Sequence, residues 1–264
     1  MKYFVLAAML LTFNLDLTAQ KKKSKEQAAP AKTEAVNQSA AVISTNTQVS
    51  DTAKISQQEA EVNLLINHFY VKYQVANQFA DYDVARSALY DLIIEFPAND
   101  SLLLSLGFLY YENQKYPSAV LVGQELLARN SKNPAALELT ASSYEGLNIN
   151  EKALQNYESL YLLSNSLSVL YKVSFLQYGL NRYQECLANT DIILASKEAD
   201  EVKVAFTTTD NKTKEYSIRI PILNLKGMVA RDTGDKAAAK KYFEQSLTLA
   251  PDFQAAKDNL AKLK

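Results

Sequence analysis

The chain has 264 residues, of which 48% are hydrophobic, and it contains six glycines, six prolines and no tryptophan. This much apolar sequence with so few chain breakers favours helices over a β-sandwich or a β-barrel. A net charge of −1 argues against nucleic-acid binding, and a single cysteine and a single histidine exclude an intrachain disulfide and most histidine-based metal sites or catalytic triads.

Residues 1–19 have the pattern of a secretory signal peptide. Lys2 is followed by an apolar run that extends from Tyr3 to Phe13, and the small residue Ala19 precedes an expected cleavage site before Gln20. A membrane anchor is the alternative, but a helix over this run spans only about 16 Å of the roughly 30 Å of hydrocarbon in a bilayer. We therefore expect an exported protein of the bacterial periplasm or cell envelope, with no transmembrane segment after cleavage.

Residues 20–57 are polar and basic. They contain one proline and no aromatic residue, and such a segment buries too little surface to offset the entropy of ordering it. We expect a disordered tether. Its positive charge is concentrated in Lys21, Lys22, Lys23 and Lys25, which either keep the segment soluble or make weak contact with anionic lipid or cell-wall polymer.

The remainder of the chain, residues 58–264, repeats with a regular period. Ala85, Ala119 and Ala153 are evenly spaced, and their separation is one such period. Within each unit apolar residues recur at helical spacing, and turn signals rich in proline and asparagine separate the units. The unit is therefore a pair of antiparallel helices, which buries its apolar face by stacking on the neighbouring pairs.

Two of the units carry a distinctive set of spaced residues. These are Leu103, Leu106, Gly107, Tyr110, Tyr116, Ala119 and Leu127 in one unit, and Leu223, Gly227, Ala230, Gly234, Ala239, Phe243, Leu247 and Pro251 in the other. On these positions the chain resembles the tetratricopeptide repeat (TPR) proteins, although it lacks the tryptophan that is frequent early in that repeat. The resemblance implies an all-α fold, a right-handed solenoid of helical hairpins. The expected units are residues 66–99, 100–133, 134–166, 167–199 and 220–253, followed by a capping helix over 254–264.

An insertion separates the last two units, because the distance along the chain from Cys186 to Ala239 exceeds one period by more than half a period. The inserted sequence alternates between apolar and polar residues, which predicts a β-hairpin over about residues 201–220. The expected register places Phe206 opposite Tyr216, Val204 opposite Ile218 and Val202 opposite Ile220, with a loop at residues 210–212. The apolar hairpin surface then consists of Val202, Val204, Phe206, Tyr216 and Ile218. An isolated hairpin is marginal in water, so this surface packs on the solenoid or on a partner, whose strand would extend the free edge.

In the tetratricopeptide family the first helix of each pair lines a concave groove that contacts ligands. The resemblance places the following residues at such positions: Tyr70, Gln74, Asn77, Leu104, Phe108, Tyr111, Glu138, Ser142, Glu145, Tyr171, Phe175, Tyr178, Asn224, Met228 and Arg231. They do not form the Lys, Arg and Asn clamp with which some members hold a C-terminal carboxylate. Their aromatic rings either bind an apolar or extended peptide or fill the inside of a short superhelix.

The sequence contains no phosphate-binding loop, zinc motif or nucleophile elbow. Asp81 and Asp83 lie at an expected bend, where helix capping explains them. Glu138 and Glu145 are about 10 Å apart on one helical face, which would permit acid–base chemistry on a sugar, but a solvated helix face explains them more simply. Cys186 occupies the small-residue position of its unit and is expected to be a buried, inert thiol.

We therefore expect no enzyme activity, no cofactor and no metal. The main hypothesis is a non-catalytic scaffold of the bacterial cell envelope, which binds another protein or peptide through the aromatic groove, the hairpin or both. The alternative is a glycan-binding or enzyme-accessory subunit in the periplasm or at the outer membrane, with aromatic rings stacked on sugars. A hydrolase that uses Glu138 and Glu145 is the third hypothesis.

Overall fold

The computed structural model describes residues 45–207 and 212–263. The expected signal peptide and the first part of the expected tether lie outside the described residues. Helix α1 (Thr45–Gln78) begins inside the range 20–57 that the sequence assigned to the tether, so residues 45–57 are helical. Contacts divide the chain after Lys54, and the repeats belong to the second unit, residues 55–264.

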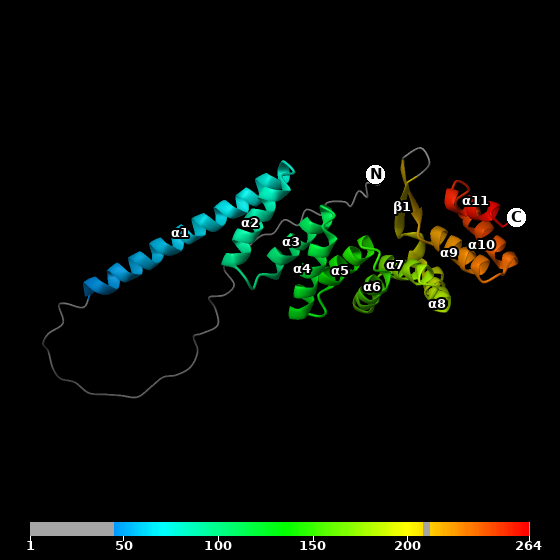
Figure 1. Ribbon diagram of the computed structural model, residues 1–264, viewed down its shortest axis with the longest axis horizontal. Helices are drawn as coiled ribbons and strands as arrows, with labels where there is room; N and C mark the ends of the chain where they lie inside the picture. Colours follow the sequence, from blue (N-terminus) through cyan, green and yellow to red (C-terminus); the bar gives the residue numbers. More distant parts are fainter. Residues whose placement is uncertain (1–44, 208–211, 264) are drawn as a thin grey trace, which may run out of the picture. The chain divides into compact units, whose positions relative to one another are not determined.

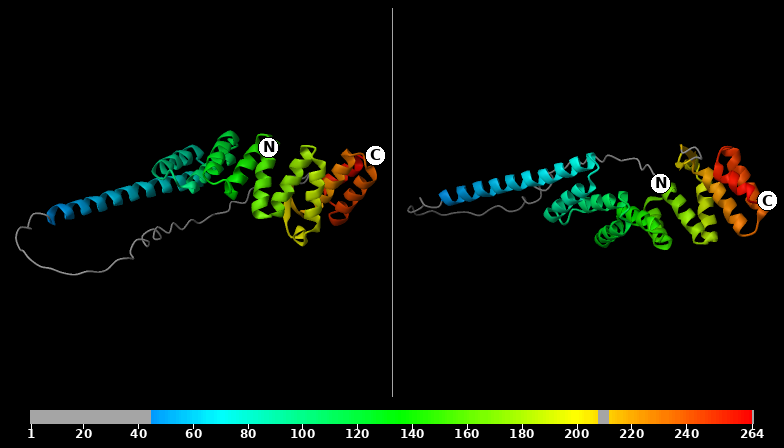
Figure 2. Two further views of the ribbon diagram at one scale, coloured as in Figure 1. Left: turned by 90° about the horizontal axis from the view of Figure 1, so that it is seen from below. Right: turned by 45° about the horizontal axis from the view of Figure 1, so that its top comes forward.

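Ten of the helices described in the chain form five successive pairs (Figures 1 and 2). The first pair is α1 with α2 (Tyr82–Glu95). The others are α3 (Asp100–Glu112) with α4 (Tyr116–Arg129), α5 (Pro134–Gly146) with α6 (Asn150–Ser164), α7 (Leu167–Gly179) with α8 (Tyr183–Ala195), and α9 (Arg219–Asp232) with α10 (Lys236–Leu249). A last helix, α11 (Gln254–Ala261), packs on α9 and α10. Each pair from α3 onward packs on its neighbours in chain order, which makes a solenoid.

The turn inside each pair has the same backbone form. It contains one residue with positive φ, namely Ala80, Gln114, Asn148, Asn181 and Gly234 in successive pairs. The next residue donates its amide to the carbonyl five positions earlier, at 2.8–2.9 Å in all five turns. This is the hydrogen bond that closes a helix whose last residue turns left-handed. The period expected from the alanines is therefore present in the backbone as well.

The small residue of each unit lies where the helices meet. Ala85, Ala119, Ala153, Cys186 and Ala239 are all completely buried. A larger side chain at any of these positions would push two helices apart, because protein interiors are close-packed. The expectation that Cys186 is a buried thiol is confirmed, and its burial raises the pKa to about 12.

The predicted β-hairpin is present between α8 and α9, after a short 3₁₀ helix η1 (Lys197–Asp200). Strand β1 (Lys203–Thr207) pairs antiparallel with β2 (Thr213–Ser217). The predicted register is wrong: Val204 lies opposite Tyr216 and Phe206 opposite Lys214. A shift of two residues keeps each side chain on its expected face. The centre of the expected loop, residues 210 and 211, lies outside the described residues.

The end of the hairpin explains the register error. Helix α9 begins at Arg219, so Ile218 and Ile220 do not belong to a strand as expected. Pro221 lies in the first turn of α9, where an amide has no partner within the helix and its absence costs nothing. The apolar alternation continues from the strand into the helix, and sequence pattern alone does not separate the two.

Candidate binding surface

The aromatic residues expected in the groove are half-buried on α3 and α7. On α7, the ring centroids of Tyr171 and Phe175 are 4.7 Å apart, and both rings pack against the main hydrophobic core. On α3, the ring of Tyr111 lies 5.6 Å from that of Tyr116 on α4, and Phe108 and Leu104 are also half-buried. Each of these side chains therefore contributes to packing and leaves part of its surface exposed.

A buried tyrosine of α6 connects two groove positions of α5 to a lysine of α7. The hydroxyl of Tyr157 lies 2.8 Å from the Ser142 hydroxyl and donates to Glu145 Oε2 at 3.1 Å, both on α5. It accepts a hydrogen bond of 2.9 Å from Lys172 Nζ on α7, and the same ammonium lies 4.8 Å from the ring centroid. These four residues form the central network, which joins α5, α6 and α7.

The phenols of this region are neutral hydrogen-bonding groups. Burial raises the pKa of Tyr157, and the nearby Glu145 carboxylate raises it further. Burial likewise raises the pKa of Tyr171 and of Tyr111, where the neighbouring Lys172 partly offsets the effect. None of these phenols is poised to act as a phenolate base at neutral pH. The network therefore suits the positioning of a ligand's polar groups better than proton transfer.

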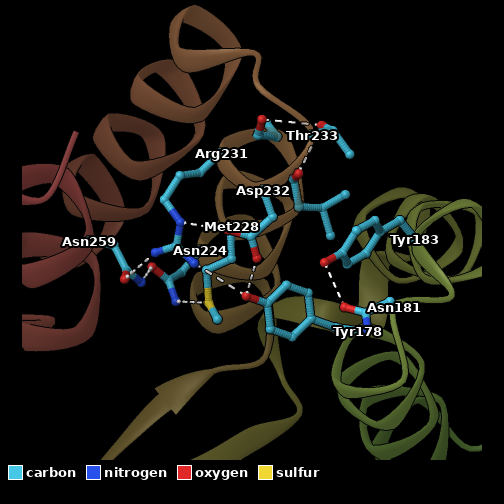
Figure 3. Close-up of polar contacts among 11 residues, drawn as sticks. Tyr178, Asn181, Tyr183, Asn224, Met228, Arg231, Asp232, Thr233 and Asn259 are labelled. Carbon is cyan, nitrogen blue, oxygen red and sulfur yellow. Dashed lines mark hydrogen bonds and ion pairs between the residues drawn. The ribbon is translucent and has the colours of Figure 1, made fainter.

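A second polar network lies between α7 and α9 (Figure 3). The hydroxyl of Tyr178 donates to Asp232 Oδ2 at 2.6 Å and accepts from Arg231 Nη2 at 3.3 Å. Arg231 also donates from Nε to Asp232 Oδ1 at 2.8 Å. Tyr178 and Arg231 are both positions that the resemblance assigns to the groove, so the fold brings the fourth and fifth units together there.

The same network extends to the capping helix α11. Arg231 Nη1 donates to Asn259 Oδ1 at 3.2 Å, and Asn259 Nδ2 donates to Asn224 Oδ1 at 2.9 Å. Asn224 Nδ2 lies 3.5 Å from Met228 Sδ. The three groove positions of α9 (Asn224, Met228 and Arg231) are thus connected, and α11 occupies the side of α9 that faces away from α7 (Figure 3).

Charge and burial oppose each other at Asp232. Burial alone would raise its pKa, but the hydrogen bonds from Arg231 and Tyr178 outweigh burial and lower the pKa. At Tyr178 burial and the adjacent Asp232 raise the pKa to about 12, and the nearby charge of Arg231 offsets only part of this rise. The carboxylate and the phenol are therefore a charged acceptor and a neutral donor at neutral pH.

The remaining groove positions lie outside these networks. Gln74 and Glu138 are exposed, and Tyr70 and Asn77 are half-buried on α1. Asn77 hydrogen-bonds to Tyr73, whose pKa is raised mainly by burial. A hollow of about 500 Å³ lies near the α1–α2 turn, lined in part by Phe79, Tyr82, Arg86, Tyr110 and Lys115. No expected groove residue lines this hollow.

The apolar face of the hairpin packs on the protein's own helices. Val202 and Val204 pack against the main core, and Tyr216 and Ile218 are buried. The rings of Phe206 and Tyr216 each lie 5.1 Å from the ring of Phe253, which precedes α11. Side chains of the expected hairpin surface are therefore covered by the chain itself, and direct contact of Tyr216 or Ile218 with a partner does not fit the structure.

Arg219 fastens the base of the hairpin. Its guanidinium donates to the carbonyl oxygens of Leu194 at 2.8 Å and Ser196 at 3.2 Å, and to both carboxylate oxygens of Asp200. Ser217 Oγ donates to the carbonyl of Ala199 at 2.6 Å. The hairpin is thus joined to the end of α8 as well as to α11, which makes it a structural insert with fixed orientation.

Four residues of the two networks were not expected from the sequence. Tyr157 and Lys172 lie outside the groove positions that the family alignment supplies, and Asp232 follows Arg231 directly. Asn259 lies on α11, to which no repeat position corresponds. The signal that was available for Asp232 is its position at the end of a groove helix beside an arginine, whereas Tyr157 and Lys172 are found only from the packing of α5, α6 and α7.

Residues considered for chemistry have structural roles. Asp81 Oδ1 accepts the amide of Val84 at 3.2 Å and so caps α2, as expected, and Asp83 pairs with Arg86. Across the residues described, no group of three or more His, Cys, Asp or Glu side chains is arranged to hold a metal ion. Among the helices of the described ranges, none is long and apolar enough to cross a membrane.

Comparison with known proteins agrees with this architecture. Residues 220–253 match the family model described as tetratricopeptide repeat. The described solenoid has the tetratricopeptide-repeat fold. No curated protein matches the sequence.

Several solved structures share the TPR fold at low sequence identity. A tetratricopeptide repeat protein from Parabacteroides merdae ATCC 43184 is 21% identical, with a TM-score of 0.60, and the match covers 75% of this chain and 72% of that one. The MamA protein is 15% identical, with a TM-score of 0.56 and coverage of 75% and 94%. YrrB, described as a TPR protein with an unusual peptide-binding site, is 11% identical, with a TM-score of 0.57 and coverage of 72% and 88%. At these identities the likeness concerns the fold, and this fold is typical of protein-interaction scaffolds.

Proposed function

We propose that this protein is a non-catalytic scaffold of the bacterial cell envelope, which holds an extended segment of a partner protein along α3, α5, α7 and α9. The observation that carries the proposal is the series of half-buried rings, Phe108, Tyr111, Phe175 and Tyr178, beside two fully connected polar networks. Half-buried aromatic side chains provide large contact area at low entropic cost. The networks supply fixed donors and acceptors for the backbone of the bound segment.

The charges of the groove residues restrict which kind of partner segment can bind. The central network offers one ammonium, Lys172, and one carboxylate, Glu145, close together, and the second network pairs Arg231 with Asp232. Paired charges of opposite sign favour a segment without strong net charge. We therefore propose an apolar, extended peptide as the ligand. YrrB, which shares the fold, is described as having a peptide-binding site, and this supports the class of ligand.

The test compares groove side chains with matched side chains on the second helices. A photo-reactive benzophenone amino acid at position 108 is expected to cross-link a defined envelope protein in living cells. The same amino acid at Leu162, an exposed position of α6, is expected not to. Cross-linking of the same protein from both positions, or from neither, would argue against the groove as the binding surface.

Binding strength gives the second readout. A peptide that spans the cross-linked segment is expected to lose at least about tenfold in affinity to the variant Phe108→Ala/Tyr111→Ala/Phe175→Ala, since central aromatic contacts each contribute more than about 1 kcal/mol. The control is Ile94→Ala/Leu121→Ala/Leu162→Ala, which removes three exposed side chains from α2, α4 and α6. Both variants must keep the helical circular dichroism of the parent. Unchanged affinity in the groove variant would show that its rings serve packing alone.

Export is tested separately. The protein isolated from cells is expected to begin at Gln20, as shown by N-terminal sequencing, and to appear in the periplasmic or envelope fraction. An N-terminus at Met1 in the cytosolic fraction would remove the envelope from the proposal but leave peptide binding to be judged by the groove experiment.

A further inference from the structure

The hollow of about 500 Å³ near the α1–α2 turn lies between the turns of the first two helix pairs. It is bounded by Phe79 in the α1–α2 turn, by Tyr82 and Arg86 at the start of α2, by Tyr110 near the end of α3 and by Lys115 in the α3–α4 turn. We call it the turn hollow. Its volume lies within the range of about 300–1,000 Å³ that is typical of small-molecule sites.

The polar lining of the turn hollow is not required by the repeat. One period after Arg86 stands Val120, and one period after Asn113, which also lines the hollow, stands Leu147. Val120 is buried in the main hydrophobic core, and Leu147 packs against that core. The junction between the second and third pairs is therefore packed with apolar side chains at positions where the junction between the first two pairs carries polar ones.

A glycine explains why the aromatic ring of Tyr82 remains beside the hollow. Its equivalent one period later is Tyr116, whose ring atoms would lie 2.8 Å from a Cβ atom on Gly146, so this ring lies directly on the glycine. One period before Gly146 stands Glu112, which carries a side chain at that place. Tyr82 therefore does not pack as Tyr116 does, and its side chain is 42% exposed.

Three aromatic rings offer flat apolar surfaces to the turn hollow. The ring of Phe79 is 74% exposed, and Tyr110 is half-buried with its hydroxyl 2.6 Å from that of Tyr90, which holds its ring in place. The face of an aromatic ring carries partial negative charge. The C–H groups on the face of a sugar ring carry partial positive charge, so they pack well on such rings.

The charges that line the turn hollow cancel. Asp81 and Asp83 oppose Arg86 and Lys115, and Arg86 Nη2 lies 2.8 Å from Asp83 Oδ1. Among the residues that the structure describes, none pairs with the ammonium of Lys115. A charged ligand of either sign would meet two charges of its own sign, which argues against a phosphate group and against a basic side chain.

The same polar groups argue against an apolar ligand. A purely apolar side chain would cover charged groups without offering them hydrogen bonds, which is costly. Each hydroxyl group of a sugar both donates and accepts. A neutral sugar therefore satisfies the ammonium and guanidinium donors as well as the carboxylate acceptors, while its C–H face covers a ring.

We propose that the turn hollow binds a neutral sugar unit of a glycan. One face of the sugar ring packs on Phe79 or Tyr82, and its hydroxyl groups bond to Lys115 and to the charged pair at the start of α2. No expected groove residue lines this hollow. The proposal therefore goes beyond peptide binding, and either site can fail without the other.

Amide spectra of the ¹⁵N-labelled purified protein test the site, with the neutral disaccharides maltose, cellobiose and N,N′-diacetylchitobiose as probes. At about 10 mM, a sugar with a dissociation constant of about 1 mM occupies about nine-tenths of the sites. At least one of the three probes is expected to shift amide signals of residues 79–86 and 110–115 and to leave those of α7 and α9 unchanged. The absence of such shifts with all three probes would overturn the proposal.

Removal of the exposed rings gives the second readout. Phe79→Ala/Tyr82→Ala is expected to weaken sugar binding at least about tenfold, since aromatic contacts of this kind each contribute substantially to binding. The matched control is Phe96→Ala, which removes a ring that is 40% exposed just beyond the end of α2. It is expected to bind like the parent. Unchanged affinity in the double variant, or equal loss in the control, would contradict the proposal.

Two further measurements separate this site from other occupants. Inorganic phosphate and arginine amide, each at about 10 mM, are expected to leave the amide signals of the turn hollow in place. Shifts with either of them and not with the sugars would exclude a neutral ligand. The groove variant Phe108→Ala/Tyr111→Ala/Phe175→Ala is expected to retain sugar binding, whereas loss of sugar binding in that variant, with its helical circular dichroism intact, would place the sugar in the groove.

Discussion

The first and the last helix pairs of the solenoid are built from the same repeat, but they differ in how much of their surface neighbouring elements cover. Of the seventeen large apolar side chains that are exposed among residues 62–207 and 212–263, eleven lie in residues 62–96, on α1, α2 and their turns. Helix α9 is buried over most of its length, between α7 and α8 on one side and α10, α11 and the hairpin on the other. An end unit of a solenoid needs a cover, and this chain supplies one for its C-terminal end.

The cover of the C-terminal pair depends on one aromatic residue. Phe253 is 2% exposed and contacts the rings of both Phe206 and Tyr216. Phe253→Ala is expected to destabilise the protein by about 3–5 kcal/mol, because it opens a cavity between the hairpin and α11. Phe79→Ala at the other end, where the ring is 74% exposed, is expected to cost less than about 0.5 kcal/mol. Urea unfolding of both variants measures the difference, and equal effects would break the contrast between the ends.

Helix packing inside the C-terminal pair provides the second comparison. A Cβ atom on Gly227 would lie 2.4 Å from Cε1 of the buried Phe243 ring, so Gly227→Ala is expected to cost about 1–3 kcal/mol through overpacking. Gly179, at the end of α7, has no neighbouring atom within 4 Å of such a Cβ. Gly179→Ala is therefore expected to be neutral or slightly stabilising. Thermal unfolding tests the pair, and a tolerated alanine at position 227 would mean that α9 and α10 can separate locally.

Helix caps show whether the two ends unfold together. Asp81 caps α2, and Asp235 caps α10 by accepting the amide of Ala238 at 2.9 Å. Replacing either with alanine is expected to cost about 1 kcal/mol. In hydrogen exchange, Asp81→Ala is expected to weaken protection of α1 and α2 alone, and Asp235→Ala that of all C-terminal helices, because the exposed first pair opens by itself. Uniform loss of protection in both variants would show one cooperative unit.

The smallest expected effect is a pH dependence of the C-terminal end. The pKa of Asp232 is lowered in the folded protein relative to its ordinary value of 3.8. The stabilisation is therefore fully present above about pH 5 and is lost as the pH falls through the lowered pKa. Asp232→Asn is expected to flatten the fall in stability between about pH 5 and pH 2, measured by urea midpoints. An unchanged profile would mean that other carboxyl groups govern acid unfolding.

Local sequence was sufficient to predict the helix pairs, but it did not predict where β2 ends or where α1 begins. The alanine period predicted the buried small residues, and the alternation in residues 201–220 predicted a hairpin with the correct faces. Its register was wrong because Ile218 and Ile220 continue the alternation into α9, where the backbone is already helical. The helical start of α1 at Thr45 was also missed, since residues 45–57 contain few of the large apolar residues from which an amphipathic helix is recognised.

The groove was predictable as a set of positions but not as an arrangement of contacts. The resemblance supplied Tyr178, Asn224, Met228 and Arg231, which the fold connects through Asp232 and Asn259. It gave no reason to choose Tyr157 or Lys172. Those two residues are separated by a turn and meet only because α6 and α7 pack side by side.

The sequence by itself determined the repeat, the helix pairs, their small buried residues and the presence of an insert, because these follow from spacing along one chain. Only the tertiary structure decided what each surface faces. It placed the rings of the hairpin against Phe253, joined several groove positions into two networks, and left apolar side chains of α1 exposed. The physical reason is that burial and pairing depend on which helix lies beside a residue, and that is set by packing between units rather than by the pattern within one.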